Sequence, residues 1–188
     1  MRITVAVTGA SGAIYAHRLL YALTQSDKVS KVYLIFTDSG AKVWEWELPE
    51  VNPMESYGSK VEILNNRSFF CDIASGSNSA DAMVVVPCSV GSASRIATGI
   101  SSTLLERAAD VQLKEQKQLI VVVRESPLSL IHLRNLTALS EAGAVILPAS
   151  PSFYSSPVTL EDIVDTIVER ILDKLGLKNN NFFRWKQK

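Results

Sequence analysis

Apolar residues follow two alternating patterns along the chain. Short, β-branched runs that predict strands cover residues 3–7, 29–36, 61–64, 82–87, 118–123 and 144–147. Apolar residues recur at helical spacing over residues 13–24, 41–48, 103–116, 128–142 and 158–175, and a further helix ends at 96–99. Residues 49–60 and 148–157 are expected to be loops, and residues 72–81 a small-residue loop or a short helix. Strands that alternate with helices predict a parallel α/β sheet covered on both faces.

Small or polar residues directly follow four of the predicted strands. They are Gly9 to Gly12, Thr37, Cys88 to Gly91, and Arg124 with Glu125. Ligands of open parallel sheets bind beyond the carboxyl ends of the strands, so we expect these residues to converge. This set suits a flat ring system with one phosphate better than a long dinucleotide.

The first strand runs through Thr8-Gly9-Ala10-Ser11-Gly12 into a helix. Unpaired N–H groups and the helix dipole make such a helix start suitable for an anion. The hypothesis is that the turn holds the phosphate or the ring edge of a phosphorylated cofactor. The alternative is a plain tight turn, and a short Gly-x-x-Gly does not decide between them.

Composition narrows the class of protein. The chain has 188 residues, with 19 Lys plus Arg and 19 Asp plus Glu, so no overall charge recruits nucleic acid or an anionic membrane. No leader-like segment or membrane-length apolar run is present, and the two cysteines fit a reducing compartment, so a cytoplasmic protein is expected. Two histidines, far apart in sequence, make a metal site unexpected. We predict one domain over residues 1–176 and a tail over 177–188.

The first turn partly matches the motif of nicotinamide-dependent dehydrogenases. Thr8 and Gly9 fit the Thr-Gly-x-x-x-Gly-x-Gly pattern, but Ala13 and Tyr15 stand where glycines belong. The chain also has no Tyr-x-x-x-Lys pair. Asp38 follows the second strand and could contact a ribose, but the pattern as a whole argues against this class.

Two charged sets are candidates for chemistry, each with a structural alternative. Arg107 and Lys114 are seven residues apart on a predicted helix, so two turns bring them to one face that could clamp a phosphate. The alternative is a solvated face paired with Glu106 and Glu115. Arg124-Glu125 directly follows a buried strand and could tune a carboxylate for proton transfer, or be a structural ion pair.

Several longer stretches resemble the flavin prenyltransferase family of the UbiX type, formerly described as aromatic-acid decarboxylases. They are TGASGAIYAHRLL, ASGSNSADAMVVVPCSVGS, ATGISSTLLERAADVQLKE, LIVVVRESPLSLIHLRNL and GAVILPASPSFYSSPVTLEDIVDTIVERILD. The resemblance covers nearly the whole chain. It implies a Rossmann-like, flavodoxin-type fold, reduced FMN and dimethylallyl phosphate as substrates, and no metal. It also implies a homo-oligomer, often a dodecamer, with sites at subunit contacts, and a prenylated FMN product passed to a separate decarboxylase.

The resemblance also assigns roles to residues. The FMN contacts fall on Gly9, Ala10, Ser11, Thr37, Cys88, Ser89, Val90, Gly91 and Arg124. The prenyl-phosphate contacts fall on Arg107, Lys114, Tyr154 and Arg170, and Trp185 matches an aromatic that can cover the site. Ser11, Glu47 and Glu125 match positions implicated in proton handling. Glu125, with Ser11 as a relay, could provide the base for ring closure, but the sequence does not identify which residue is that base.

Some positions depart from the family pattern. Thr37 stands where relatives commonly have Ser, Asp38 where Lys is common, and Ala16 replaces a frequent Gly. Two rival functions remain: an FMN-dependent decarboxylase of the related cysteine-decarboxylase group, and a non-catalytic FMN carrier. The first needs a Pro-Ala-Ser-Ala-Asn-Thr stretch where this chain has Pro87-Cys88-Ser89-Val90-Gly91-Ser92. The carrier function is favoured if the four prenyl-phosphate candidates lie apart.

Overall fold

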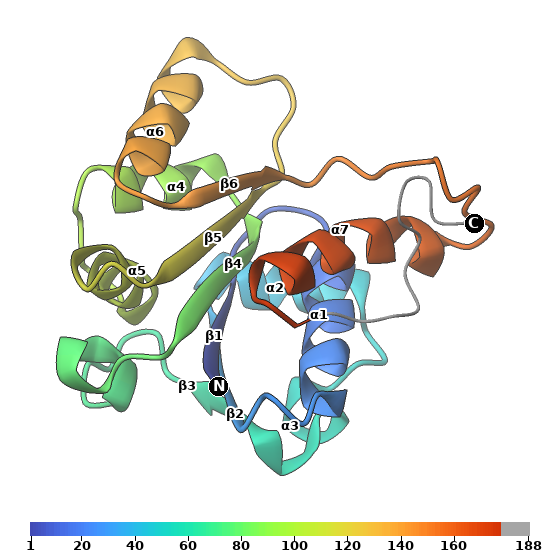
Figure 1. Cartoon of the computed structure of the whole chain (residues 1–188), viewed down its shortest axis with the longest axis horizontal. Helices are drawn as coiled ribbons and strands as arrows, with labels where there is room; N and C mark the ends of the chain where they lie inside the picture. The colour runs from blue at the N-terminus through green and yellow to red at the C-terminus, as the bar shows by residue number, and fades with distance from the viewer. Residues whose placement is uncertain (178–188) are drawn as a thin grey trace.

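Six parallel strands form the centre of the molecule, for which a computed structural model describes residues 1–177 (Figure 1). They are β1 (Arg2–Val7), β2 (Lys31–Phe36), β3 (Val61–Leu64), β4 (Ala82–Cys88), β5 (Gln118–Val123) and β6 (Val145–Pro148). Their order in the sheet is β3-β2-β1-β4-β5-β6, and each neighbouring pair is parallel. This confirms the expected Rossmann-like sheet. The direction of winding reverses between β1 and β4, which is where such sheets bind ligands.

Helices cover both faces of the sheet (Figure 1). They are α1 (Ala13–Gln25), α2 (Asp38–Glu47), α3 (Pro53–Ser56), α4 (Val90–Ala97), α5 (Leu104–Lys114), α6 (Leu130–Glu141) and α7 (Leu160–Lys174). Three short 3-10 turns are η1 (Gly58–Lys60), η2 (Asp72–Ala74) and η3 (Gly76–Asn78). One apolar core lies between the sheet and the α1–α7 pair, and a second lies under α4, α5 and α6. The strands are therefore apolar on both sides, as in β4, which is buried throughout.

Capping residues explain most differences from the predicted boundaries. Helix α2 begins at Asp38, not at residue 41, because the Thr37 hydroxyl accepts a hydrogen bond from the Gly40 N–H at 2.9 Å. Helix α6 begins after Ser129 and helix α7 after Thr159, and both capping residues belong to a reciprocal capping box. The expected loop over residues 49–60 contains α3 and η1, where Asn52 caps a proline-started turn.

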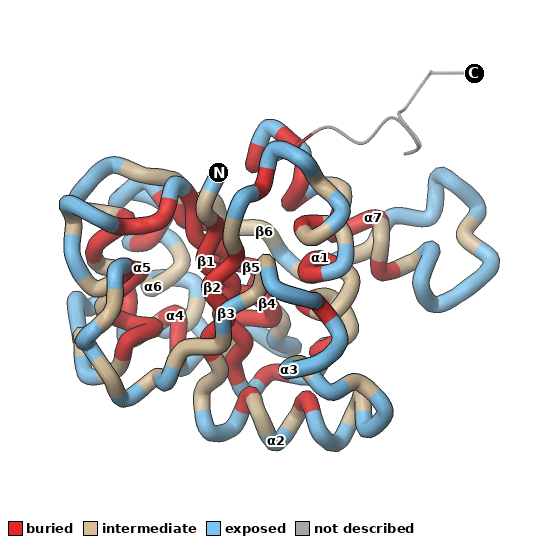
Figure 2. The backbone as a smooth tube through the Cα atoms, turned by 90° about the horizontal axis from the view of Figure 1, so that it is seen from below, coloured by how far each residue is buried: buried red, intermediate tan, exposed pale blue. Residues whose placement is uncertain are grey.

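The segment between β6 and α7 leaves the body of the molecule and returns, forming a protruding arm (Figure 2). We call residues 149–159 the arm. Most of its residues are exposed, including the aromatic side chains of Phe153 (67%) and Tyr154 (70%). An extended segment that buries so little of its own apolar surface is typical of one that packs against another molecule.

Candidate active site

A cavity of about 380 Å³ opens at the carboxyl ends of β1, β2 and β4. Its walls come from the segments that follow β1, β2, β3 and β4 and from helices α2, α4 and α5. The lining residues are Gly9, Thr37, Asp38, Ser39, Asn66, Arg67, Ser89, Gly91, Ser92, Arg95, Thr103, Leu105 and Glu106. The structure thus brings four of the expected flavin contacts together, namely Gly9, Thr37, Ser89 and Gly91.

Thr8 ties the two central strand ends to each other. Its buried hydroxyl donates to the Pro87 carbonyl at 2.8 Å and accepts from the Ser89 N–H at 2.7 Å. On the next residue, a Cβ added to Gly9 would lie only 2.6 Å from the Cβ of Ser39. Glycine is therefore required there, because the β1 turn and the start of α2 approach too closely for a side chain.

Small polar residues at the start of α4 form one wall of the cavity. The Ser89 hydroxyl accepts from the Ser92 N–H at 3.3 Å and donates to the Ser92 hydroxyl at 3.1 Å. Cys88, by contrast, is fully buried, and burial raises the pKa of its thiol to about 12. The thiol stays protonated at neutral pH, so Cys88 acts as a small packing residue and not as a nucleophile. Neither Cys88 nor Val90 lines the cavity.

The start of α1, where a phosphate was one expectation, is already satisfied by a carboxylate of the chain. Glu47 accepts hydrogen bonds from the Gly12 N–H at 2.9 Å and the Ala13 N–H at 2.7 Å. Gly12 has a φ of 110°, a left-handed conformation that glycine adopts without strain. A phosphate at this helix start would have to displace or oppose Glu47, so the phosphate alternative is disfavoured here and the ring-edge alternative remains.

Arg124 connects the end of β5 to the first turn. Its Nε donates to the Ser11 carbonyl at 3.0 Å, and its own N–H donates to the Cys88 carbonyl at 3.1 Å. Ser11 is exposed, Ala10 is buried, and Glu125 is exposed with its carboxylate accepting from the Ser126 N–H at 3.1 Å. Ser11, Arg124 and Glu125 therefore meet at one edge of the sheet, beside the cavity and outside its lining.

Arg107 and Lys114 share a face of α5, as their spacing predicted. Arg107 donates from Nε to the Ala74 carbonyl at 3.0 Å, and the Lys114 amine lies beside Gly76. Each also has an ion pair on its own helix, Arg107 with Asp110 at 2.8 Å and Lys114 with Glu115 at 2.6 Å. The expected pairing with Glu115 is present, but Glu106 pairs with a different arginine.

The remaining prenyl-phosphate candidates lie elsewhere. Tyr154 is in the arm, and Arg170 is on α7 with a side chain 66% exposed, 3.9 Å from Asp173. None of Arg107, Lys114, Tyr154 and Arg170 lines the cavity. Within one chain the four side chains do not converge. Trp185 lies outside the described residues.

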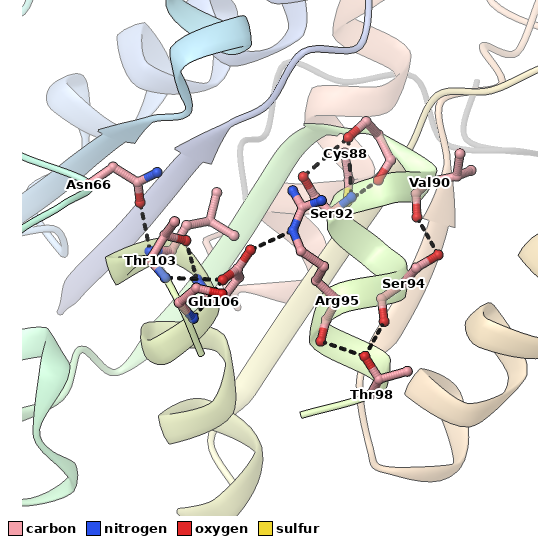
Figure 3. Close-up of polar contacts among 12 residues, drawn as sticks. Asn66, Cys88, Val90, Ser92, Ser94, Arg95, Thr98, Thr103 and Glu106 are labelled. Atoms are coloured by element: carbon pink, nitrogen blue, oxygen red, sulfur yellow. Dashed lines mark hydrogen bonds and ion pairs between the residues drawn. The ribbon is translucent and has the colours of Figure 1, made fainter. Parts of the chain in front are cut away.

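The expectations from sequence missed an ion pair on the cavity wall. Arg95 of α4 donates from Nε to the Glu106 carboxylate of α5 at 2.5 Å (Figure 3). Arg67 and Asp38 form a second pair at 2.6 Å, exposed at the mouth. The pattern Thr103-Leu-Leu-Glu106 is a capping-box signature and could have identified the role of Glu106. No local pattern could have paired it with Arg95, eleven residues away on another helix.

Both histidines have structural partners. His17 Nδ1 is 2.6 Å from the Tyr57 hydroxyl, and His132 accepts from the Ser129 N–H at 3.2 Å. Over residues 1–177 no group of three His, Cys, Asp or Glu side chains could hold a metal ion, and no helix is long and apolar enough to cross a bilayer. The polar groups at the cavity are thus hydroxyls, amides, carboxylates and guanidiniums.

Comparison with known proteins agrees with this fold. The Flavoprotein family model matches residues 1–172. The chain is 43% identical to flavin prenyltransferase UbiX of Methanocaldococcus jannaschii, covering 98% of each chain, and 45% identical to that of Thermoplasma acidophilum, covering 98% of this chain and all of the relative. Among solved structures, it superposes with a TM-score of 0.92 on AnUbiX (PadA1) in complex with FMN and dimethylallyl pyrophosphate. That structure is 37% identical, and the match covers 100% of this chain and 98% of the other. Because this identity extends over nearly the whole length, the chain belongs to the flavin prenyltransferase family of the UbiX type.

Proposed function

We propose that this protein joins a dimethylallyl group from dimethylallyl phosphate to N5 and C6 of reduced FMN, making prenylated FMN for a partner decarboxylase. The observation that carries the proposal is the cavity at the ends of β1, β2 and β4. Its hydroxyl, N–H and guanidinium donors fit a phosphorylated flavin. When bound, reduced FMN supplies the electron-rich ring that accepts the prenyl group.

The chain holds the flavin between two kinds of contact. Thr37 and Ser89 place hydroxyls on the cavity wall, and the first turn of α4 presents N–H groups there. At the other end, the β1 turn from Gly9 to Ser11, held by Arg124 and Glu47, faces the ring edge. Of the nine predicted flavin contacts, Cys88 acts through the backbone, since its thiol is buried and hydrogen-bonded to the Ser89 carbonyl.

Arg107, Lys114, Tyr154 and Arg170 bind the prenyl phosphate in our proposal. Cations and a phenol that surround a leaving phosphate neutralise it, and an enclosed site keeps water from the allyl fragment. Because these side chains lie on α5, the arm and α7 of a single chain, the proposal requires that neighbouring subunits bring them to one flavin. A relative from Escherichia coli O157:H7, 37% identical with a TM-score of 0.92 over 99% of this chain and all of that one, is described as dodecameric. We propose a homo-oligomer of that kind here.

The candidates for proton transfer lie beside the cavity, at the carboxyl ends of the strands. Ring closure requires a base that removes a proton, and Glu125 is an exposed carboxylate next to Arg124. Ser11 lies at the same edge through its bond with Arg124 and provides a hydroxyl that can relay the proton. Glu47 is the third candidate, although its three short contacts with the start of α1 give it a structural role as well.

Two rival functions make different predictions. The Escherichia coli relative is described as an FMN-dependent decarboxylase, and TvaF, an FMN-dependent cysteine decarboxylase, shares the fold at 16% identity with a TM-score of 0.60. No histidine lines the cavity, and burial raises the pKa of the Cys88 thiol, which disfavours decarboxylation by this chain. A flavin carrier would fit a single chain in which the four phosphate-binding candidates lie apart, and it would bind FMN without transferring a prenyl group.

The test is anaerobic incubation with reduced FMN and either dimethylallyl phosphate or dimethylallyl diphosphate. Mass spectrometry should find a flavin heavier by one five-carbon unit with at least one donor, and the ratio of rates identifies the preferred donor. Oxidised FMN serves as the control and should give no adduct. A protein that binds FMN and yields no adduct with either donor would be a carrier, whereas release of carbon dioxide from a peptidyl or aromatic acid would favour the decarboxylase.

A further inference from the structure

The ion pair between Arg95 and Glu106 is anchored more firmly than a surface pair. Glu106 is 3% exposed and accepts from the Ser102 N–H at 2.8 Å and the Thr103 N–H at 3.0 Å, in addition to Arg95. Burial alone would raise the pKa of Glu106, but these hydrogen bonds outweigh it and lower the pKa. The carboxylate is therefore ionised at neutral pH and fully occupied by donors that fix its position.

This anchor leaves the outer half of the Arg95 guanidinium available. Only Nε is engaged by Glu106, the side chain is 46% exposed, and its guanidinium makes no other hydrogen bond within residues 1–177. A Cβ added to Gly91 would lie 3.8 Å from Nη1, so the guanidinium lies over the first turn of α4. Figure 3 shows the side chain reaching from α4 toward Ser92 and Glu106. Its two terminal nitrogens thus add hydrogen-bond donors beside the N–H groups and hydroxyls of that turn.

We propose that Arg95 binds the 5′-phosphate of FMN and that Glu106 is the positioning residue that holds it there. The inference rests on the proposed function only for the identity of the flavin. A planar guanidinium fixed through Nε presents two parallel Nη donors, the arrangement that binds phosphate oxygens in pairs. Ser89 and Thr37 line the same cavity and complete the donor set with hydroxyls.

Arg67 is the other cation of the cavity and the competing candidate. Its guanidinium is 77% exposed and is paired with Asp38, which is 74% exposed. Such a pair is weakly held, because both side chains must give up rotamer freedom in water. Arg95, by contrast, is held by a buried carboxylate with three donors, so its geometry is set before the ligand binds.

The experiment compares FMN with riboflavin, which differ only by the phosphate, in fluorescence titrations of the apo protein. For Arg95→Ala the Kd of FMN should rise by about 10- to 100-fold, while the Kd of riboflavin stays unchanged. Arg95→Lys keeps the charge and loses the forked pair of donors, so its Kd for FMN should lie between those of wild type and Arg95→Ala. Glu106→Gln should reduce the preference for FMN over riboflavin less than Arg95→Ala does. Arg134→Ala, an exposed arginine outside the cavity, is the matched control and should change neither constant.

An unchanged ratio of FMN to riboflavin affinity in both Arg95→Ala and Arg95→Lys would overturn the inference. So would a preference for FMN that disappears in Arg67→Ala alone. If Arg95→Ala does not fold, it loses riboflavin binding too, and Arg95→Lys then decides. The titrations need no prenyl donor, so a protein that binds FMN through Arg95 and transfers nothing would contradict the proposed function and leave this inference standing.

Discussion

The flavin cavity and the prenyl-phosphate candidates are built in opposite ways. In the cavity, side chains are held by bonds to other elements, as Thr8 is to Pro87 and Arg95 to Glu106. The ion pairs of two prenyl-phosphate candidates are local: Arg107 pairs with Asp110 and Arg170 lies near Asp173, each three residues along the same helix. Arg107 has one bond to another element, to the Ala74 carbonyl. The cavity lining comes from segments that meet within one chain, whereas the prenyl-phosphate candidates are spread over α5, the arm and α7.

This difference suggests how each region is used. Long-range anchors order a site before its ligand binds, which lowers the entropy cost of binding. Half-exposed pairs on one helix contribute only about 0.2 to 1 kcal/mol, so a phosphate can replace the carboxylate at little cost. In our proposal, the cavity is ordered before FMN binds, and the prenyl-phosphate site forms when neighbouring subunits and the donor come together.

The largest effect is expected for Glu125→Gln, which should impair the reaction without affecting the binding of FMN or of the prenyl donor. The amide cannot take up a proton, so ring closure should slow by about 10²- to 10⁴-fold while FMN and donor still bind. Anaerobic mass spectrometry and absorbance should detect an open, singly attached adduct of the same mass as the product. Full activity would remove Glu125 from the mechanism and leave Ser11 or Glu47 as the base.

Next come Arg107→Ala and Arg170→Ala, which test whether two chains share one site. Each variant should lose about 10²- to 10³-fold in kcat/KM for the donor and keep its FMN affinity. Co-expressing the two variants should restore roughly one quarter of wild-type activity, because one random pairing in four unites both intact residues. Lys28→Ala, an exposed lysine with no assigned role, is the control. Absence of any recovery would place both arginines in sites formed by one chain.

Glu47→Ala should have a moderate effect on stability. Removing the carboxylate leaves the Gly12 and Ala13 N–H groups without their acceptor, so the free energy of unfolding should fall by about 1 to 2 kcal/mol. Glu45→Ala, exposed on the same helix, should change it by less than about 0.5 kcal/mol. Denaturant unfolding measures both. Unchanged stability together with lost turnover would mean that Glu47 acts in the reaction and does not stabilise the fold.

The smallest effect concerns pH. Since the pKa of Glu106 is lowered on folding, its stabilisation is present at neutral pH and disappears as the pH falls through the folded-state pKa, below the usual glutamate range. Wild type should therefore exceed Glu106→Gln by roughly 1 kcal/mol near pH 7, and the two should converge in acid. Unfolding curves measured from pH 7 to pH 3 would show it. A constant gap would mean that the carboxylate charge has no part in the anchor.

The sequence predicted the regions governed by local patterns. β-Branched runs located all six strands, and the residues after β1, β2 and β4 located four of the cavity's lining residues, because a parallel sheet brings its carboxyl ends together. The spacing of Arg107 and Lys114 correctly placed them on one face. Arg95, Asn66 and Arg67 were missed, since their positions depend on how α4, α5 and the segment after β3 pack. The arm was expected as a loop, but nothing local in it indicated that Tyr154 would lie outside the lining of the cavity.

The carboxylate of Glu47 at the start of α1 also gives the flavin site a polarity. A flavin inserted back to front would bring its phosphate against that carboxylate, two anions in contact with the same pair of N–H groups. In the proposed orientation, the phosphate lies against the Arg95 guanidinium and the flavin ring lies toward the Glu47 carboxylate. In our proposal, Glu47 therefore disfavours the reversed orientation of the flavin.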